Sequence, residues 1–411
     1  MNIRDRENDD LIEAQAVGRT CIVVAGDFCP IKRTAKAILT GRAAEMVASI
    51  DRILKEADLS IVNLEAPLTT TESGIRKTGP NLRGDPECVE FLEVAGFDVA
   101  NLANNHIRDM GSDGVLDTLA ILKEKGISTV GAGGNLRDAL EPLILEGNCG
   151  RIAILSYAEN EFSIADEFSA GAANLDPILN LEQIKRISSE NDVTIVLVHG
   201  GNEYCPVPSP RMRQRYKAFA EAGASAVVAT HTHCPQGVEM VNGVPIFYSM
   251  GNFLFDTPFK DVEYSEEDFW WKGYMVKLDL AGDKVASFEL VPVSSGPDGT
   301  AVKLLEGDKR NLFLGYIQHI SDLIQDGEKL NSLWHAWCLK EGPQWIEYFK
   351  KAQYPMAGDD ISMNALILRN GFTCEAHHEV VLTFLRMMCE DRIEEAAGAL
   401  KELEGLQKGI H

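Results

Sequence analysis

The sequence predicts an α/β fold followed by a helical tail. Between residues 20 and 256, short and uniformly apolar runs alternate with segments whose apolar residues recur at helical spacing. Uniformly apolar runs are typical of strands that are buried on both faces, as in parallel sheets. Most of these runs stop at a polar residue, and beyond about residue 302 the pattern is helical throughout.

Individual elements up to residue 256 follow from local patterns. Residues 21–27 are too uniformly apolar for a half-exposed edge strand. Pro67 ends the second strand because its nitrogen has no hydrogen to donate to a ladder. Ser112 is a suitable N-cap, and Gly126 lies just past the end of that helix. The expected strands are 21–27, 57–67, the start of 98–111, 127–133, 151–158, 193–200, 224–233 and 245–252, and the expected helices are 35–57, 86–96, 112–126, 181–190 and 210–223.

The last third of the chain has a different pattern. Two period-two strands are expected after residue 272, and residues 294–300 have the composition of a linker. Helices are then expected over about 310–340, 343–351 and 377–407. We therefore expect one domain over residues 19–299 and an all-helical C-terminal domain over 300–411 that folds apart from it. The pair His377 and His378 is expected to be solvated at a helix start.

Composition and charge exclude several classes of protein. The hydrophobic fraction is 45%, and no apolar run approaches the length of about 18 residues needed to span a bilayer. The polar start and the nine cysteines without a CxxC pair fit a reducing compartment, so we expect a cytoplasmic protein with no membrane span. A net charge of -23, from 39 basic and 62 acidic residues, repels nucleic acid, which we do not expect as a partner.

One stretch, DVANLANNHIRDMG over residues 98–111, combines an apolar run with an abrupt polar end. Asn105 is a neutral oxygen donor suited to a divalent metal, and His106 is the type of side chain that titrates nearest neutrality. Asp109 could orient that imidazole. The alternative interpretation is a polar turn that caps a strand.

The same feature recurs at the ends of other strands. In an open α/β sheet, ligands bind at the carboxyl ends of the strands, and a carboxylate such as Glu65 can bridge two divalent ions. Two ions about 3.5–4 Å apart can hold a bridging hydroxide and polarise the bond that it attacks. The recurrence predicts a metal or hydrolytic site with one or two divalent ions. The polar residues at these strand ends are Asp27, Glu65, Asn105, His106, His199, His231 and His233.

Six segments of the chain resemble those of a known family. In order and spacing, GDFCP, NLEAPLT, LANNHIRDMG, VHGGNEY, HTHCPQGVE and YSMGNFLFD are similar to the bacterial CapA family, which is associated with capsule and poly-gamma-glutamate synthesis. The resemblance covers about residues 21–256. That family in turn resembles calcineurin-like metallophosphoesterases, which implies a four-layer α/β/β/α sandwich, here with a C-terminal all-helical extension.

The resemblance also implies roles for individual residues. His106 matches the catalytic histidine of that superfamily, and we expect catalysis to depend on His106 and Asp109. The positions that match metal ligands, for Mn, Fe, Zn or Mg, are Asp27, Glu65, Asn105, His199, His231 and His233. Three residues depart from the superfamily pattern. Cys29 stands where a histidine ligand is usual, Glu65 replaces an aspartate, and Thr230 replaces a glycine.

Substrate binding has weaker signals. Arg83 lies in a loop over residues 69–86 with Arg76 and Lys77, and its guanidinium fork matches a carboxylate or a phosphate. A solvated basic loop is the alternative for each of the three residues. Glu203 and Asn252 belong to the family's own segments and are expected at the substrate site, although either could also be a turn or cap residue. Asp256 has the same two interpretations.

Two hypotheses of function remain open. The first is a metal-dependent hydrolase in which a metal-activated hydroxide attacks a phosphoester or a glutamyl amide of an anionic small molecule or polymer. The second is a non-catalytic protein of capsule or poly-gamma-glutamate synthesis that binds the polymer. The intact His106 favours the first hypothesis. Cys29 and the acidic composition favour the second.

Overall fold

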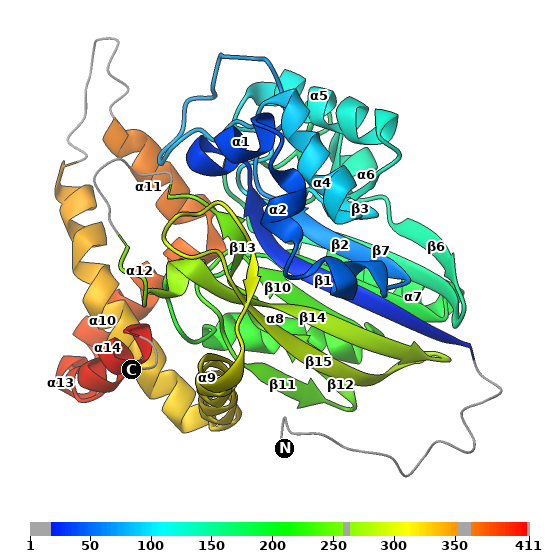
Figure 1. Ribbon diagram of the computed structural model, residues 1–411. Coiled ribbons are helices and arrows are strands. Elements are labelled where there is room, and N and C mark those ends of the chain that lie inside the picture. The colour runs from blue at the N-terminus through cyan, green and yellow to red at the C-terminus, as the bar shows by residue number, and fades with distance from the viewer. Residues whose placement is uncertain (1–17, 258–263, 352–362, 409–411) are drawn as a thin grey trace.

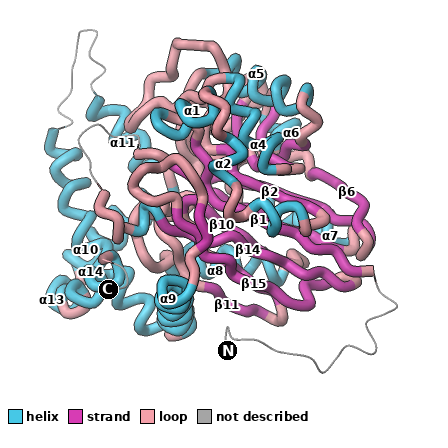
Figure 2. The backbone as a smooth tube through the Cα atoms, viewed as in Figure 1, coloured by secondary structure: helices cyan, strands magenta, loops and turns pink. Residues whose placement is uncertain are grey.

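The computed structural model describes residues 18–257, 264–351 and 363–408. It shows a mixed α/β protein with two large sheets and a helical C-terminal region (Figures 1 and 2). The polar start of the chain lies outside the described residues.

The first sheet has eight strands in the order β16-β15-β14-β1-β2-β3-β4, and β13 also pairs with β1. The pairs β1–β2, β2–β3, β3–β4 and β1–β13 are parallel, while β14 runs antiparallel to β1. The strands are β1 (Arg19–Cys29), β2 (Leu59–Leu64), β3 (Val99–Asn101), β4 (Ser128–Val130), β13 (Asn252–Phe255), β14 (Lys272–Ala281), β15 (Lys284–Ser294) and β16 (Lys303–Leu304).

The second sheet has six strands in the order β11-β12-β10-β9-β7-β6. Its four central strands are parallel, and β6 and β11 are antiparallel to their neighbours at the two edges. The strands are β6 (Leu143–Gly147), β7 (Gly150–Ala158), β9 (Val193–His199), β10 (Ala226–Thr230), β11 (Val238–Val241) and β12 (Val244–Phe247); β5 (Ala132–Gly133) and β8 (Gly171–Ala172) form a separate pair.

The two sheets pack against each other, and this explains the uniformly apolar strands. On β1, Ile22 and Val24 belong to the apolar cluster that includes the strands of the second sheet. The alternate residues Val23 and Ala25 belong to a second cluster with helices α1, α2 and α4. Because successive side chains on a strand point to opposite faces, a strand covered on both sides needs apolar residues at every position.

The helices of this part of the chain are mostly those expected, but the prediction of Ser112 as an N-cap is wrong, because that helix begins at Gly111 and its N-cap is Met110. The helix expected over residues 35–57 is instead three short helices, because Gly41 takes a positive φ of 75° that ends the first of them. The helices are α1 (Lys32–Leu39), α2 (Ala43–Val47), α3 (Asp51–Lys55), η2 (Pro86–Val89), α4 (Glu90–Ala95), α5 (Gly111–Glu124), α6 (Leu136–Ala139), α7 (Leu179–Glu190), α8 (Pro210–Glu221) and η3 (Phe269–Trp271).

Two edge strands, β6 and β11, are absent from the elements that the sequence predicts. Most residues of β6 are only partly buried, so they lack both a continuous apolar run and a clear alternation. Strand β11 forms a hairpin with β12 through Asn242 and Gly243, whose φ angles of 51° and 87° fit a type I′ turn. The Asn-Gly pair is a hairpin signal that could have revealed β11.

The C-terminal region is helical, as expected, but its helices begin and end elsewhere. The helix expected over 310–340 is interrupted at Asp326, whose carboxylate accepts from the backbone N–H of Glu328 and of Lys329. Pro343 lies inside a helix rather than between two. The helices are α9 (Gly307–Gln325), α10 (Gly327–Lys351), α11 (Met363–Thr373), α12 (Glu375–Cys389), α13 (Ile393–Ala397) and α14 (Leu400–Gln407).

The helical region shares its core with the second sheet. Phe313 and Ile317 of α9 belong to the same apolar cluster as Val238 of β11. The hydroxyl of Ser321 accepts from the backbone N–H of Val238 at 2.8 Å. Strand β16 continues the first sheet just beyond residue 299. The division into domains at 299/300 stays a prediction. Among the described residues, no helix is both long enough and apolar enough to cross a membrane.

Candidate metal centre

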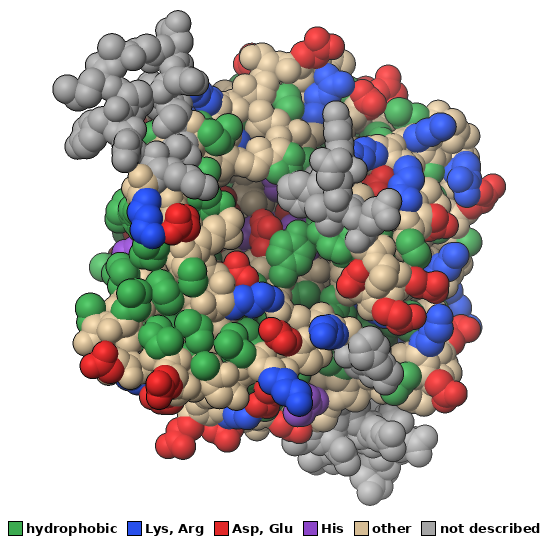
Figure 3. Space-filling model, turned by 90° about the vertical axis from the view of Figure 1, so that its left-hand side faces the viewer, with side chains coloured by type: hydrophobic (Ala, Val, Ile, Leu, Met, Phe, Trp, Pro, Cys, Tyr) green, Lys and Arg blue, Asp and Glu red, His purple; other side chains and the backbone are tan. Residues whose placement is uncertain are grey.

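The residues that the sequence places at strand ends lie together where strands of both sheets finish. Asp27 is near the end of β1, and Glu65 directly follows β2. His199 is the last residue of β9 in the other sheet. Figure 3 shows a hollow in one face of the molecule with histidine and carboxylate side chains inside it. The other members of the set follow strands β3 and β10; they are Asn105, His106, His231 and His233.

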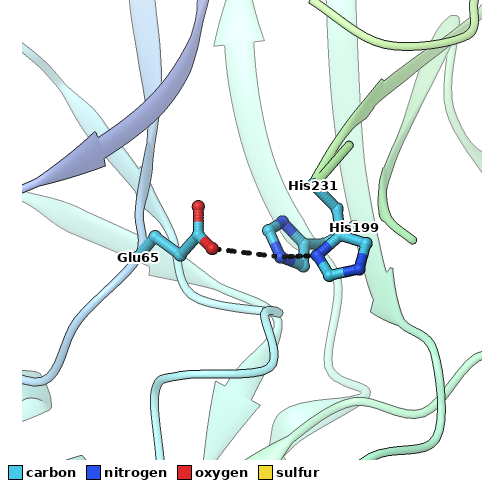
Figure 4. A group of neighbouring side chains, drawn as sticks. All are labelled: Glu65, His199 and His231. Carbon is cyan, nitrogen blue, oxygen red and sulfur yellow. Dashed lines mark hydrogen bonds and ion pairs between the residues drawn. The ribbon is translucent and has the colours of Figure 1, made fainter. Parts of the chain in front are cut away.

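One group of possible ligands consists of Glu65, His199 and His231, whose ligand atoms all lie within 4.8 Å of one another (Figure 4). Nε2 of His199 lies 3.0 Å from Nδ1 of His231 and 3.7 Å from Oε1 of Glu65. The amide oxygen of Asn105 is 3.1 Å from the same Nε2 atom. Two imidazole nitrogens and two oxygens therefore converge on one point between the sheets.

A second group consists of Asp27, Glu65 and His233. Nε2 of His233 lies 3.9 Å from Oε1 of Glu65, and Nδ1 lies 3.9 Å from Oδ2 of Asp27. Nδ1 also lies 2.8 Å from the amide oxygen of Asn252, to which it can donate, and this leaves the lone pair of Nε2 free. Glu65 is shared by both groups, as a bridging ligand would be.

The carboxylate of Glu65 has the properties of a group made for a cation. Its residue is fully buried, and neither oxygen has a hydrogen-bond partner among the described residues. Burial raises the pKa of Glu65 well above its ordinary value, and the nearby Asp27 raises it further. A buried carboxylate without donors is costly unless a positive group faces it. A divalent ion between this carboxylate and the imidazoles fits the donor set.

The three histidines are in the form that binds metals. Burial lowers the pKa of all three imidazoles, and it lowers that of His231 to about 3. The proximity of the histidines to one another contributes to the shifts of His199 and His231. A neutral imidazole has a lone pair to offer, whereas an imidazolium has none.

The backbone at the two histidines after β10 is strained. His231 has a φ of 101° and His233 a φ of 54°, in a region that residues with a Cβ seldom occupy. Such conformations cost about 1–3 kcal/mol each and cluster at functional sites. The backbone N–H of His231 donates to Asp27 at 3.1 Å, which holds one end of this turn against the first sheet.

His106 belongs to neither ligand group in the part of the chain that the structure describes. Its Nδ1 lies 2.6 Å from Oδ2 of Asp109, so the two residues expected to act together are in contact. Asp109 is fully buried, and the same oxygen accepts from the backbone N–H of Leu82 at 2.7 Å. The catalytic roles of His106 and Asp109 stay predictions.

Comparison with known proteins gives the family of the chain. The family model described as "Bacterial capsule synthesis protein PGA_cap" matches residues 21–257. The chain belongs to this family. A capsule biosynthesis protein CapA of Bacillus anthracis is 30% identical over 302 residues, which cover 71% of this chain and 69% of the relative. A PGA biosynthesis protein CapA of Bacillus subtilis (strain 168) is 29% identical over 270 residues, which cover 62% of this chain and 69% of the relative.

Weaker matches include a further curated protein and a solved structure. A probable polyglutamine synthesis accessory protein of Mycobacterium tuberculosis is 25% identical over 249 residues, which cover 57% of this chain and 66% of the relative. Among solved structures, the crystal structure of a protein from Thermus thermophilus matches 62% of this chain and 93% of its own, at 9% identity and a TM-score of 0.34. The segment matched by the family model contains all the residues of both ligand groups.

Cys29, where the resemblance implied a histidine ligand, lies outside both ligand groups. Cys29 is fully buried in an apolar cluster with Phe255 and Trp270. Burial raises the pKa of its thiol well above the ordinary value, and Glu65 raises it further. Because Cys29 packs among aromatic rings and belongs to neither ligand group, it is a packing residue. The ligand group of Asp27 therefore has three members among the described residues.

The expected substrate anchor, Arg83, does not contact either ligand group. Its guanidinium lies 3.5 Å from the backbone oxygen of Thr71, within the same loop. The cation that the structure buries beside His106 is Lys77, whose side chain is 4% exposed. The alternative of a solvated basic residue is wrong for Lys77. Arg76 is exposed. A substrate role for Arg83 stays a prediction.

The other expected substrate residues have separate environments. Glu203 is half-buried, and burial raises its pKa to about 7. Asn252 holds His233 and donates to the backbone oxygen of Trp270 at 2.9 Å. Asp256 forms an ion pair with Arg33 at 2.5 Å, which ties the end of β13 to the start of α1.

Two residues near the site were not among the sequence predictions. The amide of Asn63 donates to Oδ1 of Asp27 at 2.7 Å, so it fixes the rotamer of a possible ligand. Glu161 lies 4.0 Å from Nε2 of His231. It follows the apolar run 151–158, so the rule that polar residues at strand ends form the site would have included it.

The C-terminal helices also reach the loops of the site. Arg211, at the start of α8, pairs with Glu159 at 2.6 Å and with Glu379 of α12 at 2.8 Å. Glu159 also accepts from the backbone N–H of Gly201, two residues after His199, at 3.1 Å. Helix α12 is thus linked through two ion pairs to the segment that follows β9.

Proposed function

We propose that this protein is a metal-dependent hydrolase that binds two divalent ions. The observation that carries the proposal is the position of Glu65. Its two oxygens are buried without hydrogen-bond donors among the described residues, and it belongs to both ligand groups. Packing alone gives no reason to bury an uncompensated carboxylate among neutral imidazoles. We also infer that the fold is the four-layer α/β/β/α sandwich, since the two packed sheets have helices on their outer faces.

Each proposed metal site has its own residues. Asp27, Glu65 and His233 would hold one ion; Glu65, Asn105, His199 and His231 would hold the other. Mixed nitrogen and oxygen donors suit Mn, Fe or Zn, and the carboxylates also suit Mg. When bound, a pair of such ions lowers the pKa of water and polarises the bond to be cleaved.

The remaining chemistry falls to the chain's own side chains. His106 is the proposed proton donor to the leaving group, and Asp109 holds its Nδ1. Asn252 keeps the ring of His233 in place, and Asn63 keeps the carboxylate of Asp27 in place. Arg83 and Glu203 are proposed to contact the substrate away from the cleaved bond.

The proposed substrate is a phosphoester or the amide bond of a glutamyl chain. The relatives are named for capsule biosynthesis, PGA biosynthesis and polyglutamine synthesis, which supports an anionic polymer or a fragment of one. The net charge of -23 opposes such a substrate over the general surface. Bound cations inside the hollow would reverse the field locally.

A second candidate function is polymer binding without catalysis during capsule or poly-gamma-glutamate synthesis. The observation that favours it is Cys29, which is packed among aromatic rings and leaves the first metal with few donors. In that case the metal would hold a carboxylate of the polymer.

The test begins with protein purified without chelators. Its metal content and its hydrolysis of a generic phosphodiester and of gamma-linked glutamate are measured on the same preparation. Two metals per chain together with turnover of either substrate supports the hydrolase. Metal without turnover, together with binding of gamma-linked glutamate, supports the second candidate. The variant His231→Ala serves as the control, because contaminating enzymes would survive that change.

A further inference from the structure

Lys77 is buried in a place where the sequence predicts a solvated residue. It lies in the loop between β2 and η2, and its side chain is 4% exposed. Its neighbour Arg76 is exposed. Burying an ammonium group is costly unless a negative partner compensates it. The contacts of Lys77 therefore have to explain its position.

The partner of Lys77 is Asp109. Nζ of Lys77 lies 2.5 Å from Oδ1 of Asp109, and it lies 3.2 Å from Nδ1 of His106. Oδ2 of the same carboxylate contacts Nδ1 of His106 and accepts from the backbone N–H of Leu82. The backbone oxygen of Asp109 accepts from the N–H of Ile75 at 2.8 Å. The loop is thus fastened to Asp109 at three points.

The two oxygens of Asp109 have different tasks. Among the described residues, Oδ1 has no hydrogen-bond partner, and the ion pair with Lys77 is what faces it. Oδ2 is left for His106 and Leu82. Without Lys77, a fully buried carboxylate oxygen would face no compensating charge, and the group would have to rotate or take up a proton. Rotation removes the acceptor that holds Nδ1 of His106, and protonation weakens it, because a neutral carboxyl group is a poorer acceptor than a carboxylate.

We propose that Lys77 is a positioning residue that fixes the carboxylate of Asp109 and thereby holds His106 in the tautomer with its proton on Nδ1. In this tautomer Nε2 has a free lone pair, so it can take up a proton from solvent and then, as the imidazolium held by Asp109, give that proton to the leaving group. An orienting carboxylate has this effect on catalytic histidines in general, and Lys77 extends the arrangement by one residue. The kinetic part of the inference rests on the proposed hydrolase function, whereas the tautomer of His106 does not.

The first measurement is a nitrogen–proton correlation spectrum of histidine-labelled protein. Wild type is compared with Lys77→Met, Lys77→Arg and Arg76→Met, and the His106 signals are assigned by their loss in His106→Asn. Wild type and Arg76→Met should show one tautomer with a proton on Nδ1. Lys77→Met should lose that single signal set. Lys77→Arg, which keeps a positive charge, should recover part of it.

The second measurement is steady-state kinetics on the same proteins. Lys77→Met should lower kcat about 10- to 100-fold, the range typical of residues that orient a functional side chain, with KM within about twofold. Arg76→Met removes the same charge from an exposed position of the same loop, so it should leave kcat unchanged. If Lys77→Met does not fold, Lys77→Gln replaces it, because it keeps most of the length without the charge.

The outcomes separate the two proposals. If wild type hydrolyses nothing, the proposed function fails, and the spectra still decide the role of Lys77. If the uncharged Lys77 variant keeps the wild-type His106 signals, the proposal is overturned. If kcat falls equally in Arg76→Met, loss of charge in the loop explains the effect and Lys77 has no special role.

Discussion

Glu65 and His199 approach each other from two different β-sheets, with Oε1 of the carboxylate 3.7 Å from Nε2 of the imidazole. Glu65 follows β2 of the eight-stranded sheet, and His199 ends β9 of the six-stranded sheet. Neither sheet has a complete ligand group without the other. The site therefore exists only once the two sheets are packed, which leads to the following predictions.

Glu65→Gln should reduce metal binding at both ligand groups at once. The amide keeps the shape of the side chain but removes the negative charge that both groups share. Metal content per chain, measured after dialysis against the metal, should fall from two to less than one. Glu203→Gln is the matched control, since Glu203 belongs to neither group, and it should keep its metal. Full metal content in Glu65→Gln would exclude a bridging role.

His106→Asn should retain metal and fold while kcat falls about 100- to 10,000-fold, the range for removal of an acid–base group. Asn105→Ala and His231→Ala should instead lose metal and activity together, because their donor atoms converge with those of His199. Metal stoichiometry and turnover are measured on all three proteins. A His106 variant that loses metal as fully as His231→Ala would place His106 among the ligands.

Cys29→Ala should leave metal content unchanged. The thiol packs with Phe255 and Trp270 and belongs to neither ligand group, so its loss removes packing and no ligand. We expect the free energy of unfolding to fall by about 1 kcal/mol from the small cavity. The comparison is His233→Ala, which should lose metal from the same region. If Cys29→Ala also loses metal, the cysteine is a ligand in the metal-bound protein.

Glu239→Gln should show a pH-dependent loss of stability. The carboxylate of Glu239, on β11, accepts hydrogen bonds from Arg213 at 2.6 Å and from Tyr248 at 2.8 Å. Burial by itself would raise the pKa of this carboxyl group. The two hydrogen bonds and the charge of Arg213 outweigh burial, so the net pKa is lowered from its ordinary value of 4.5. A lowered pKa stabilises the fold above pH 4.5, and the stabilisation disappears as the pH falls through the folded value.

Urea unfolding tests this expectation. At pH 7 the Glu239 variant should be less stable than wild type by about 2 kcal/mol, and the difference should shrink towards zero as the pH falls through the lowered pKa of the folded state. The control is Glu289→Gln, whose ion pair with Arg310 is exposed and should contribute little at either pH. An equal difference at both pH values would mean that the charge of Glu239 does not matter.

A chain that ends at Gly299 should aggregate or lose its fold. The sequence predicts a C-terminal domain that folds apart, but α9 buries Phe313 and Ile317 against the second sheet, which leads us to expect the opposite. Size-exclusion chromatography and binding of a hydrophobic dye would report the exposed surface. A monomeric truncated chain with bound metal would show that the helical region folds apart.

The sequence by itself determined the α/β class and the set of polar residues at strand ends. Both follow from local patterns, because a buried parallel strand is uniformly apolar and its first polar residue marks where it leaves the core. This pattern predicts Asp27, Glu65, His199 and His231 as site residues. The family follows from the resemblance of six segments, and the family model confirms it. The Asn-Gly turn before β12 is a local signal of the same kind, since Asn242 and Gly243 both take a positive φ.

Only the tertiary structure decided which of these residues meet and which loop residues join them. Cys29 shares a segment with Asp27, yet it packs among aromatic rings that come from residues 255–271. Lys77, Arg76 and Arg83 all carry a positive charge in one loop, and the contact with Asp109 distinguishes Lys77. Such outcomes depend on contacts between residues far apart in the chain, and the periodicity of a local segment contains no information about which distant surface will cover it.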